Sequence, residues 1–271
     1  MFEEMKNRQL LGITIFFIIL FIFVAALFSA SEDIFGLAFQ FALYIAAPVV
    51  YFRYQFNKHR VSLSDVVFIK GSKQWIPSVL VFVAISVLFS LSISWLEFIT
   101  LNSFAPRLVD LVFEPFLLPE NPVFLAITIL FICIIGPIAE EFIFRGLLLK
   151  RMISKTSVWG GILISSFLFG VLHMDIIGST IFGIIAALLY LITNNLAIPI
   201  LFHIANNSFA MIMSYLNPTW PEWLLLNSKA DLYTYIPLKV GVLIISTTMI
   251  WFVIHRLRDR LRISTVEEIS L

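Results

Sequence analysis

Residues 123–149 read VFLAITILFICIIGPIAEEFIFRGLLL, an apolar run that two glutamates and one arginine interrupt near its end. The run exceeds the ~20 residues that a helix needs to cross ~30 Å of hydrocarbon. An ionisable side chain at that depth costs from ~3 to ~10 kcal/mol or more unless it is buried, paired or useful. The stretch therefore predicts a transmembrane helix that carries functional polar groups.

The composition of the whole chain agrees with this interpretation. Its 271 residues are 60% hydrophobic and only 13% charged, which excludes an ordinary soluble domain. The apolar runs are too long for the ~10-residue alternating strands of a membrane barrel. A net charge of +1 gives no reason to expect a nucleic-acid partner. The single cysteine can form no internal disulfide.

The pattern of apolar runs predicts an all-α, polytopic membrane bundle of about eight transmembrane helices. The run after residue 10 is too long for a signal-peptide core, so we interpret it as the first retained span. No repeat or flexible linker divides the chain, and residues 1–271 are predicted to form one domain whose motif-bearing core covers about 123–215. The expected spans are 10–30, 34–52, 75–96, 123–149, 157–174, 176–194, 196–215 and 236–255.

The basic residues predict the orientation of the bundle. Fifteen of the 18 Lys and Arg residues fall in segments that share one side if the N-terminus is cytoplasmic. Since cytoplasmic loops carry an excess of Lys and Arg, both termini are predicted to be cytoplasmic.

The two adjacent glutamates of the fourth span are predicted to project from different faces of the helix. Glu141 and Arg145 stand at i,i+4 and can pair along one helix face, whereas Glu140 is rotated by about 100°. Glu140 is left without a local counter-charge and is suited to act as a general base, although a structural role is the alternative for both glutamates. Pro137 has no N–H, which frees the carbonyl of Cys133 and permits a kink toward a wet cavity.

Two later spans add polar groups. His173 ends the fifth span, and His203 and Asn207 stand at i,i+4 on one face of the seventh. The latter pair could hold an oxyanion or orient water. Histidine and asparagine also join membrane helices by hydrogen bonds, so packing is the alternative for all three. Asn206 faces about 100° away from Asn207, and there packing is the better interpretation.

Several other chemistries lack their motifs. The sequence contains no Gly-x-Ser-x-Gly elbow, no His-Glu-x-x-His zinc helix, no Gly-x-Gly-Asp motif and no Walker loop. The sequence therefore lacks the motifs of a serine hydrolase and of a zincin metalloprotease.

The polar motifs together resemble the CPBP family, named for CAAX proteases and bacteriocin-processing enzymes, and most closely its type II CAAX prenyl endopeptidase branch. The resemblance covers roughly residues 140–207; the first half of the chain matches only as hydrophobic spans. The motifs, in order on three spans, are Glu140-Glu141-x-x-x-Arg145, Phe169-x-x-x-His173 and His203-x-x-x-Asn207.

The resemblance implies a glutamate-dependent intramembrane protease that removes the last three residues of a prenylated C-terminal Cys-a-a-X sequence. On that pattern Glu140 and His173 activate water, His203 and Asn207 stabilise the oxyanion, and Glu141 with Arg145 supports them. The expected partners are a prenylated peptide and the lipid bilayer, with a site that opens toward the cytoplasm and neither cofactor nor metal.

Three alternatives stay open. One Glu and two His form the ligand set of many zinc sites, so a metalloprotease could use the same residues. The chain could instead be a non-catalytic member of the family, such as an immunity protein. A transporter is disfavoured because no inverted repeat is detectable.

The depth of His173 presents a difficulty. At about 1.5 Å per residue, Glu140 lies ~15 Å from Lys150, whereas His173 lies ~24 Å from Ser157. The two side chains meet only if the fifth helix is tilted or begins well outside the membrane.

Overall fold

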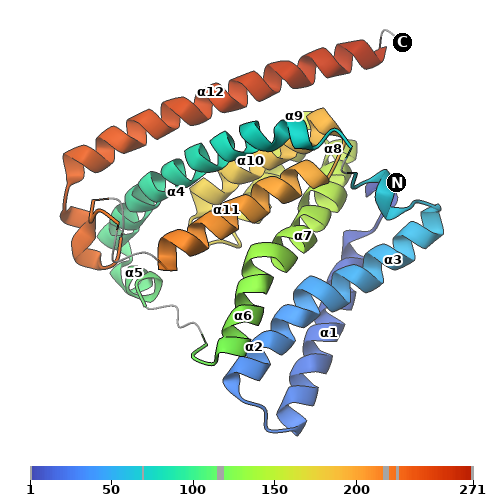
Figure 1. Ribbon diagram of the computed structural model, residues 1–271, viewed down its shortest axis with the longest axis horizontal. Coiled ribbons are helices and arrows are strands. Elements are labelled where there is room, and N and C mark those ends of the chain that lie inside the picture. Colours follow the sequence, from blue (N-terminus) through green and yellow to red (C-terminus); the bar gives the residue numbers. More distant parts are fainter. Residues whose placement is uncertain (1, 69, 115–118, 216–219, 224–225, 270–271) are drawn as a thin grey trace.

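The computed structural model describes residues 2–68, 70–114, 119–215, 220–223 and 226–269. Within these ranges the regular structure is entirely helical, which confirms the predicted all-α bundle (Figure 1). The α-helices are α1 Asn7–Leu27, α2 Glu32–Phe41, α3 Ala47–His59, α4 Ile76–Phe104, α5 Pro106–Val112, α6 Pro122–Leu130, α7 Gly136–Glu141, α8 Lys150–Lys155, α9 Val158–Gly170, α10 Ile176–Thr193, α11 Ala197–Tyr215 and α12 Ile236–Ile269.

Shorter helical elements join or interrupt these helices. Three π-helical segments continue neighbouring α-helices, and four 3-10 turns lie in the connections. The π-helices are η2 Ala42–Ala46, η5 Phe131–Ile135 and η6 Phe142–Leu149, and the 3-10 turns are η1 Phe2–Glu4, η3 Leu63–Asp65, η4 Lys73–Trp75 and η8 Lys229–Tyr233.

Seven helices of the described chain are long and apolar enough to cross a membrane. The fifth predicted span is shorter than expected, because α9 has only 13 residues. Its first turn is capped by Ser157, whose hydroxyl accepts from the Gly160 N–H at 3.0 Å. After Gly170 the chain turns, and Asp175 caps α10 by accepting from the Gly178 N–H at 2.8 Å. Residues 171–174 therefore form a connection and do not extend the helix.

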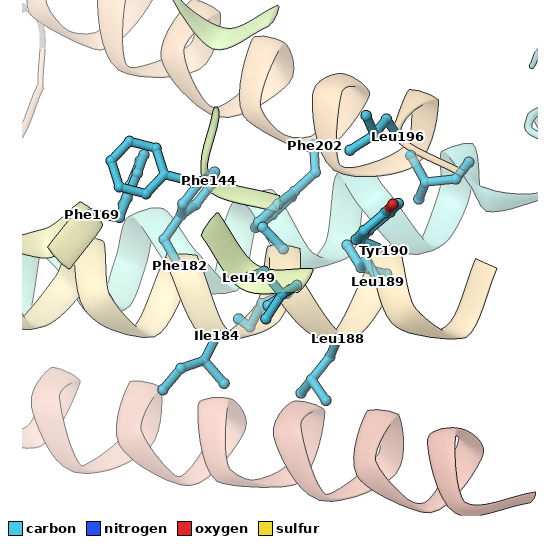
Figure 2. Packing of buried hydrophobic residues seen from close by; sticks show 14 of the residues in the cluster. Phe144, Leu149, Phe169, Phe182, Ile184, Leu188, Leu189, Tyr190, Leu196 and Phe202 are labelled. Atoms are coloured by element: carbon cyan, nitrogen blue, oxygen red, sulfur yellow. The ribbon is translucent and has the colours of Figure 1, made fainter. Parts of the chain in front are cut away.

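Helix α10 lies at the centre of the bundle. Its residues from Ile185 to Leu189 are fully buried, as expected of a helix that is apolar on every face. Helices α4, α9, α11 and α12 pack around it (Figure 2). A Cβ atom at Gly183 would lie 2.9 Å from the Cβ atom of Ser166, so glycine is needed where α9 and α10 approach most closely.

The helix that carries the acidic motif runs without a break from Pro122 to Lys155, over 34 residues. Two π-helical segments, η5 and η6, flank the six-residue helix α7. The Gly136 N–H bonds to the Phe131 carbonyl, five residues back, which widens the helix. Such π-helical turns are rare and often occur at functional sites.

Helices α1 to α3 pack beside this long helix, on the side opposite α10 to α12 (Figure 1). The start of α1, helix α8 and the C-terminal end of α12 lie toward the same end of the bundle (Figure 1). That end carries the basic segments that the sequence assigns to the cytoplasm, an assignment that stays a prediction.

Candidate active site

Three charged or polar side chains form the buried centre of the site. The Glu141 carboxylate, at 0% exposure, lies 3.2 Å from the Arg145 Nε atom and 2.8 Å from the His203 Nδ1 atom. The first contact is the i,i+4 ion pair that the sequence predicts. The second joins α11 to α7. Because a carboxylate only accepts, the His203 Nδ1 atom is the donor, and the ring is held in one orientation.

Aromatic rings surround the arginine. The Arg145 guanidinium carbon lies 4.5 Å from the centre of the Phe169 ring and 6.0 Å from those of Phe144 and Phe182. Its two terminal nitrogens have no hydrogen-bond partner among the described residues. Cation–π attraction within about 6 Å therefore takes the place of further hydrogen bonds.

Glu140 differs from its neighbour in direction and in exposure. Its side chain is 18% exposed, and its Oε2 atom lies 3.8 Å from the His203 Nε2 atom. A contact of that length is an ion-pair distance and too long for a direct hydrogen bond. His203 thus lies between the two carboxylates, with one ring nitrogen toward each.

Tyr44, in η2, is a further neighbour of Glu140. Its hydroxyl lies close enough to the Glu140 carboxylate for the two groups to interact electrostatically. The edge of its ring would lie 3.7 Å from a Cβ atom at Gly136, so the phenol packs directly over the turn before Glu140. No spacing or motif pointed to Tyr44, because it comes from a different span.

His173 lies in the turn after α9, and its ring rests against Phe169 with a centroid separation of 4.4 Å. The Phe169 ring lies 5.6 Å from that of His203, so the two imidazoles contact the same aromatic ring. The His173 Nδ1 atom lies 2.8 Å from the Phe169 carbonyl oxygen. Since a carbonyl only accepts, Nδ1 carries the hydrogen, and in the neutral ring Nε2 has a free lone pair.

The structure removes the difficulty over the depth of His173. The helix of Glu140 continues to Lys155, and α9 begins at Val158. Glu140 precedes Lys155 by fifteen positions, and His173 follows Val158 by fifteen, of which the 13 residues of α9 supply ~20 Å before the turn that carries His173. Both therefore lie at a similar distance from the tight turn between α8 and α9.

The Asn207 side chain bonds to the main chain of the π-helix η5. Its Nδ2 atom donates to the Ile132 carbonyl at 3.0 Å. In the π register of η5 that carbonyl would accept from residue 137, but Pro137 has no N–H. In an α-helix, Pro137 would leave the Cys133 carbonyl without a backbone donor, as predicted from the sequence. In the wider π-helical turn, the carbonyl without a backbone donor is that of Ile132. Asn207 uses one of its two amide hydrogens in this bond.

Five of the six predicted residues are joined directly or through Phe169, and the sixth, Asn207, instead bonds to the Ile132 carbonyl. The structure records no direct hydrogen bond or ion pair between Glu140 and His173 within the described chain. Asn206 faces α4 and lines a cavity there with Ser90 and Ser94. Among the described residues, no three His, Cys, Asp or Glu side chains are grouped as a metal site would require.

An apolar groove of about 660 Å³ reaches the back of the acidic motif. It begins beside Tyr44 and Ala139 and runs between α3 and the long helix to Asn57 and Ser62 at the basic end of the bundle. Val49, Pro48, Phe52, Ile138 and Phe142 line its walls. The groove is open toward the lipid-facing side, where Val49 is half exposed.

Comparison with known proteins finds similarity in the part of the chain that carries these residues. Residues 122–209 match the model of the family described as type II CAAX prenyl endopeptidase Rce1-like. This stretch of the chain is therefore similar to the CAAX protease family. All six predicted site residues lie within the matched stretch. The family and the apolar helices make the chain an integral, multi-pass membrane protein.

Two curated relatives are similar to part of the chain. A putative membrane peptidase, YdiL, of Bacillus subtilis (strain 168) is 39% identical over 83 residues, which are 30% of this chain and 34% of the relative. The membrane-embedded CAAX protease MroQ of Staphylococcus aureus (strain USA300) is 34% identical over 101 residues, or 34% of this chain and 41% of the relative. The chain thus spans less than half the length of the relatives that it matches. No solved structure matches it.

Proposed function

We propose that this chain is a membrane endopeptidase in which Glu140 activates a water molecule. The observation that carries the proposal is the place of His203, between the partly exposed Glu140 and the buried Glu141. A purely structural ion pair needs one carboxylate; the second one, Glu140, keeps 18% of its side chain exposed and is available for proton transfer.

His173 is suited to hold the water. Its Nδ1–H is bound to the Phe169 carbonyl, so its Nε2 lone pair can accept a hydrogen from the water. Glu140 then removes a proton as the water oxygen attacks the scissile carbonyl carbon. The carbon–nitrogen bond breaks as the tetrahedral intermediate collapses, and Glu140 returns the proton to the departing amine. The products are a new carboxylic acid and a free amine, which exchange one proton to become a carboxylate and an ammonium, so atoms and charges balance.

We assign stabilisation of the oxyanion to His203 and Asn207. Asn207 has a second amide hydrogen besides the one bound to Ile132. With both ring nitrogens of His203 protonated, the Nε2–H, which faces Glu140 at 3.8 Å without a direct hydrogen bond, would be free to donate to an oxyanion beside Glu140. Loss of one such donor commonly costs about 10²–10³ in rate.

For the substrate we propose a prenylated Cys-a-a-X tail that is cut after its cysteine. The apolar groove beside Tyr44 and Ala139 has room for a hydrocarbon chain and leads toward Glu140. Each buried methylene contributes ~0.8 kcal/mol, so the lipid would both anchor and position the peptide. The peptide end would approach from the predicted cytoplasmic side, where Lys150 and Arg151 attract a carboxylate. The family description and the name of the staphylococcal relative support this choice.

The test is a cleavage reaction in liposomes made with heavy-oxygen water and a farnesylated Cys-a-a-X peptide. Mass spectrometry should find a tripeptide and a prenyl-cysteine product that carries one heavy oxygen in its new carboxylate. We expect activity to survive chelators. Stoichiometric zinc whose removal abolishes the activity, and whose return restores it, would replace the proposal with a metalloprotease.

A non-catalytic membrane protein is the second candidate, because His203 and Asn207 each bond to the helix of the acidic motif and could serve packing alone. It predicts no cleavage of lipidated or plain peptides. Cleavage by wild type that is lost in a well-folded Glu140→Gln protein would exclude it.

A further inference from the structure

A basic cavity lies apart from the candidate active site, where the start of α1 meets α8. It has a volume of about 450 Å³ and is lined by Lys6, Asn7, Arg8, Arg151, Met152 and Lys155. Four of these six residues are cations, and none is an acid. None of the four cations forms an ion pair with a carboxylate in the part of the chain that the structure describes.

Two contacts hold the cavity in shape. A terminal nitrogen of Arg151 donates to the carbonyl oxygens of Met5 at 2.7 Å and Glu3 at 3.3 Å. The Tyr51 hydroxyl donates to the Lys6 carbonyl at 3.3 Å. The main chain from Glu3 to Lys6 is thus fixed to α3 and α8. Helix α1 starts here without a side-chain cap at Lys6 and without an acid in its first turn. The positive end of its helix dipole therefore adds to the positive electrostatic potential of the cavity.

The helix that continues from the cavity is the most lipid-accessible span, with only 11% of its apolar window buried. Leu11, Ile15 and Ile19 follow Arg8 at helical spacing and are exposed by 62%, 49% and 63%. Leu11, Ile15 and Ile19 therefore form an exposed apolar stripe along α1 that begins at the basic cavity. A free phosphate ion would make no use of the stripe, whereas a lipid with an anionic head and acyl chains would contact both.

We propose that this cavity binds the phosphodiester headgroup of an anionic phospholipid, whose acyl chains lie along the stripe of Leu11, Ile15 and Ile19. The lipid would clamp α1 to α8, at the end of the long helix that carries Glu140. Basic pockets between membrane helices on the cytoplasmic side are known to suit such headgroups. The inference is independent of the proposed peptidase activity.

The experiment is a titration of detergent-purified protein with phosphatidylglycerol, followed by the thermal unfolding midpoint and by native mass spectrometry. Phosphatidylcholine is the neutral lipid arm, and inorganic phosphate is the free-ion arm. We expect one tightly bound phosphatidylglycerol and a raised midpoint, with little effect of the other two. The pair Arg8→Gln and Lys155→Gln should weaken phosphatidylglycerol binding by about 10- to 30-fold, at ~1 kcal/mol for each basic group.

The matched control removes the same charge elsewhere at the same end of the bundle, by Lys58→Gln with Arg256→Gln, two exposed residues outside the cavity. This control should bind as wild type does. Lys155→Gln alone, at the exposed end of α8, gives the same answer if the double variant folds poorly. Equal weakening in the control, equal binding of phosphatidylcholine, or an equal effect of inorganic phosphate would each overturn the proposal.

Discussion

The His203 Nδ1 atom lies 2.8 Å from the Glu141 carboxylate, which is completely buried, and the ring presents its other nitrogen to Glu140 at 3.8 Å. One histidine therefore connects a structural carboxylate to an accessible one. Glu141 orients the ring, and Glu140 stays partly exposed. We therefore expect substitutions of Glu141 to lower stability and substitutions of Glu140 to lower activity.

Replacing Glu141 with alanine should lower stability as well as activity. Arg145 would remain buried without its counter-charge, and breaking a buried pair costs about 3–5 kcal/mol. The thermal unfolding midpoint in detergent should fall sharply, while that of Glu140→Gln should stay near wild type. A Glu141→Ala protein as stable as wild type would show that the ion pair is not structural.

Asn207→Ala should destabilise the protein through the Ile132 carbonyl, since a buried group left unpaired costs about 1–3 kcal/mol. Pro137→Ala supplies an N–H that can reach this carbonyl in the π register, so the second change should recover part of the stability of Asn207→Ala. Unfolding midpoints of the two single variants and the double variant measure this coupling. Cleavage activity should not recover. If activity returns together with stability, Asn207 serves packing and not the oxyanion.

Tyr44→Phe should reduce kcat by up to about 10-fold, because removing a polar group beside the Glu140 carboxylate costs on the order of 1 kcal/mol. The phenyl ring keeps its packing over Gly136, so the unfolding midpoint should change little. Tyr54→Phe, on the exposed side of α3, is the matched control and should leave kcat unaltered. Equal kcat values for Tyr44→Phe and wild type would remove Tyr44 from the site.

The groove should matter only to a lipidated substrate. Val49→Trp places a large ring in the groove and should raise KM for a farnesylated peptide, with little effect on the slow cleavage of the same peptide without lipid. Val50→Trp is the control, since this neighbour is similarly exposed and does not line the groove. Equal rates for the two wild-type reactions would favour a peptidase that does not require a prenyl group.

The sequence predicted the features that depend on spacing along one helix. The pairing of Glu141 with Arg145 and the divergence of Glu140 follow from 3.6 residues per turn. The helical membrane fold follows from the length of the apolar runs and is confirmed.

Contacts between helices could not be predicted in this way. The sequence paired Glu141 with Arg145 alone, and the contact with His203 comes from packing of α11 on α7. Tyr44 comes from a distant span that carries no motif. The extension of the long helix to Lys155, which brings His173 level with Glu140, was hidden by basic residues that resemble the start of a loop.

The central claim is that Glu140 is the general base, and the most direct test compares Glu140→Gln with Glu32→Gln, an exposed acid at the start of α2. Both proteins are purified, their unfolding midpoints are matched to wild type, and the initial rate of farnesylated-peptide cleavage in liposomes is measured. General-base catalysis contributes about 10²–10⁴ in rate, so Glu140→Gln should lose at least 10²-fold while Glu32→Gln keeps full activity. A folded Glu140→Gln protein that cleaves at the wild-type rate would contradict the account.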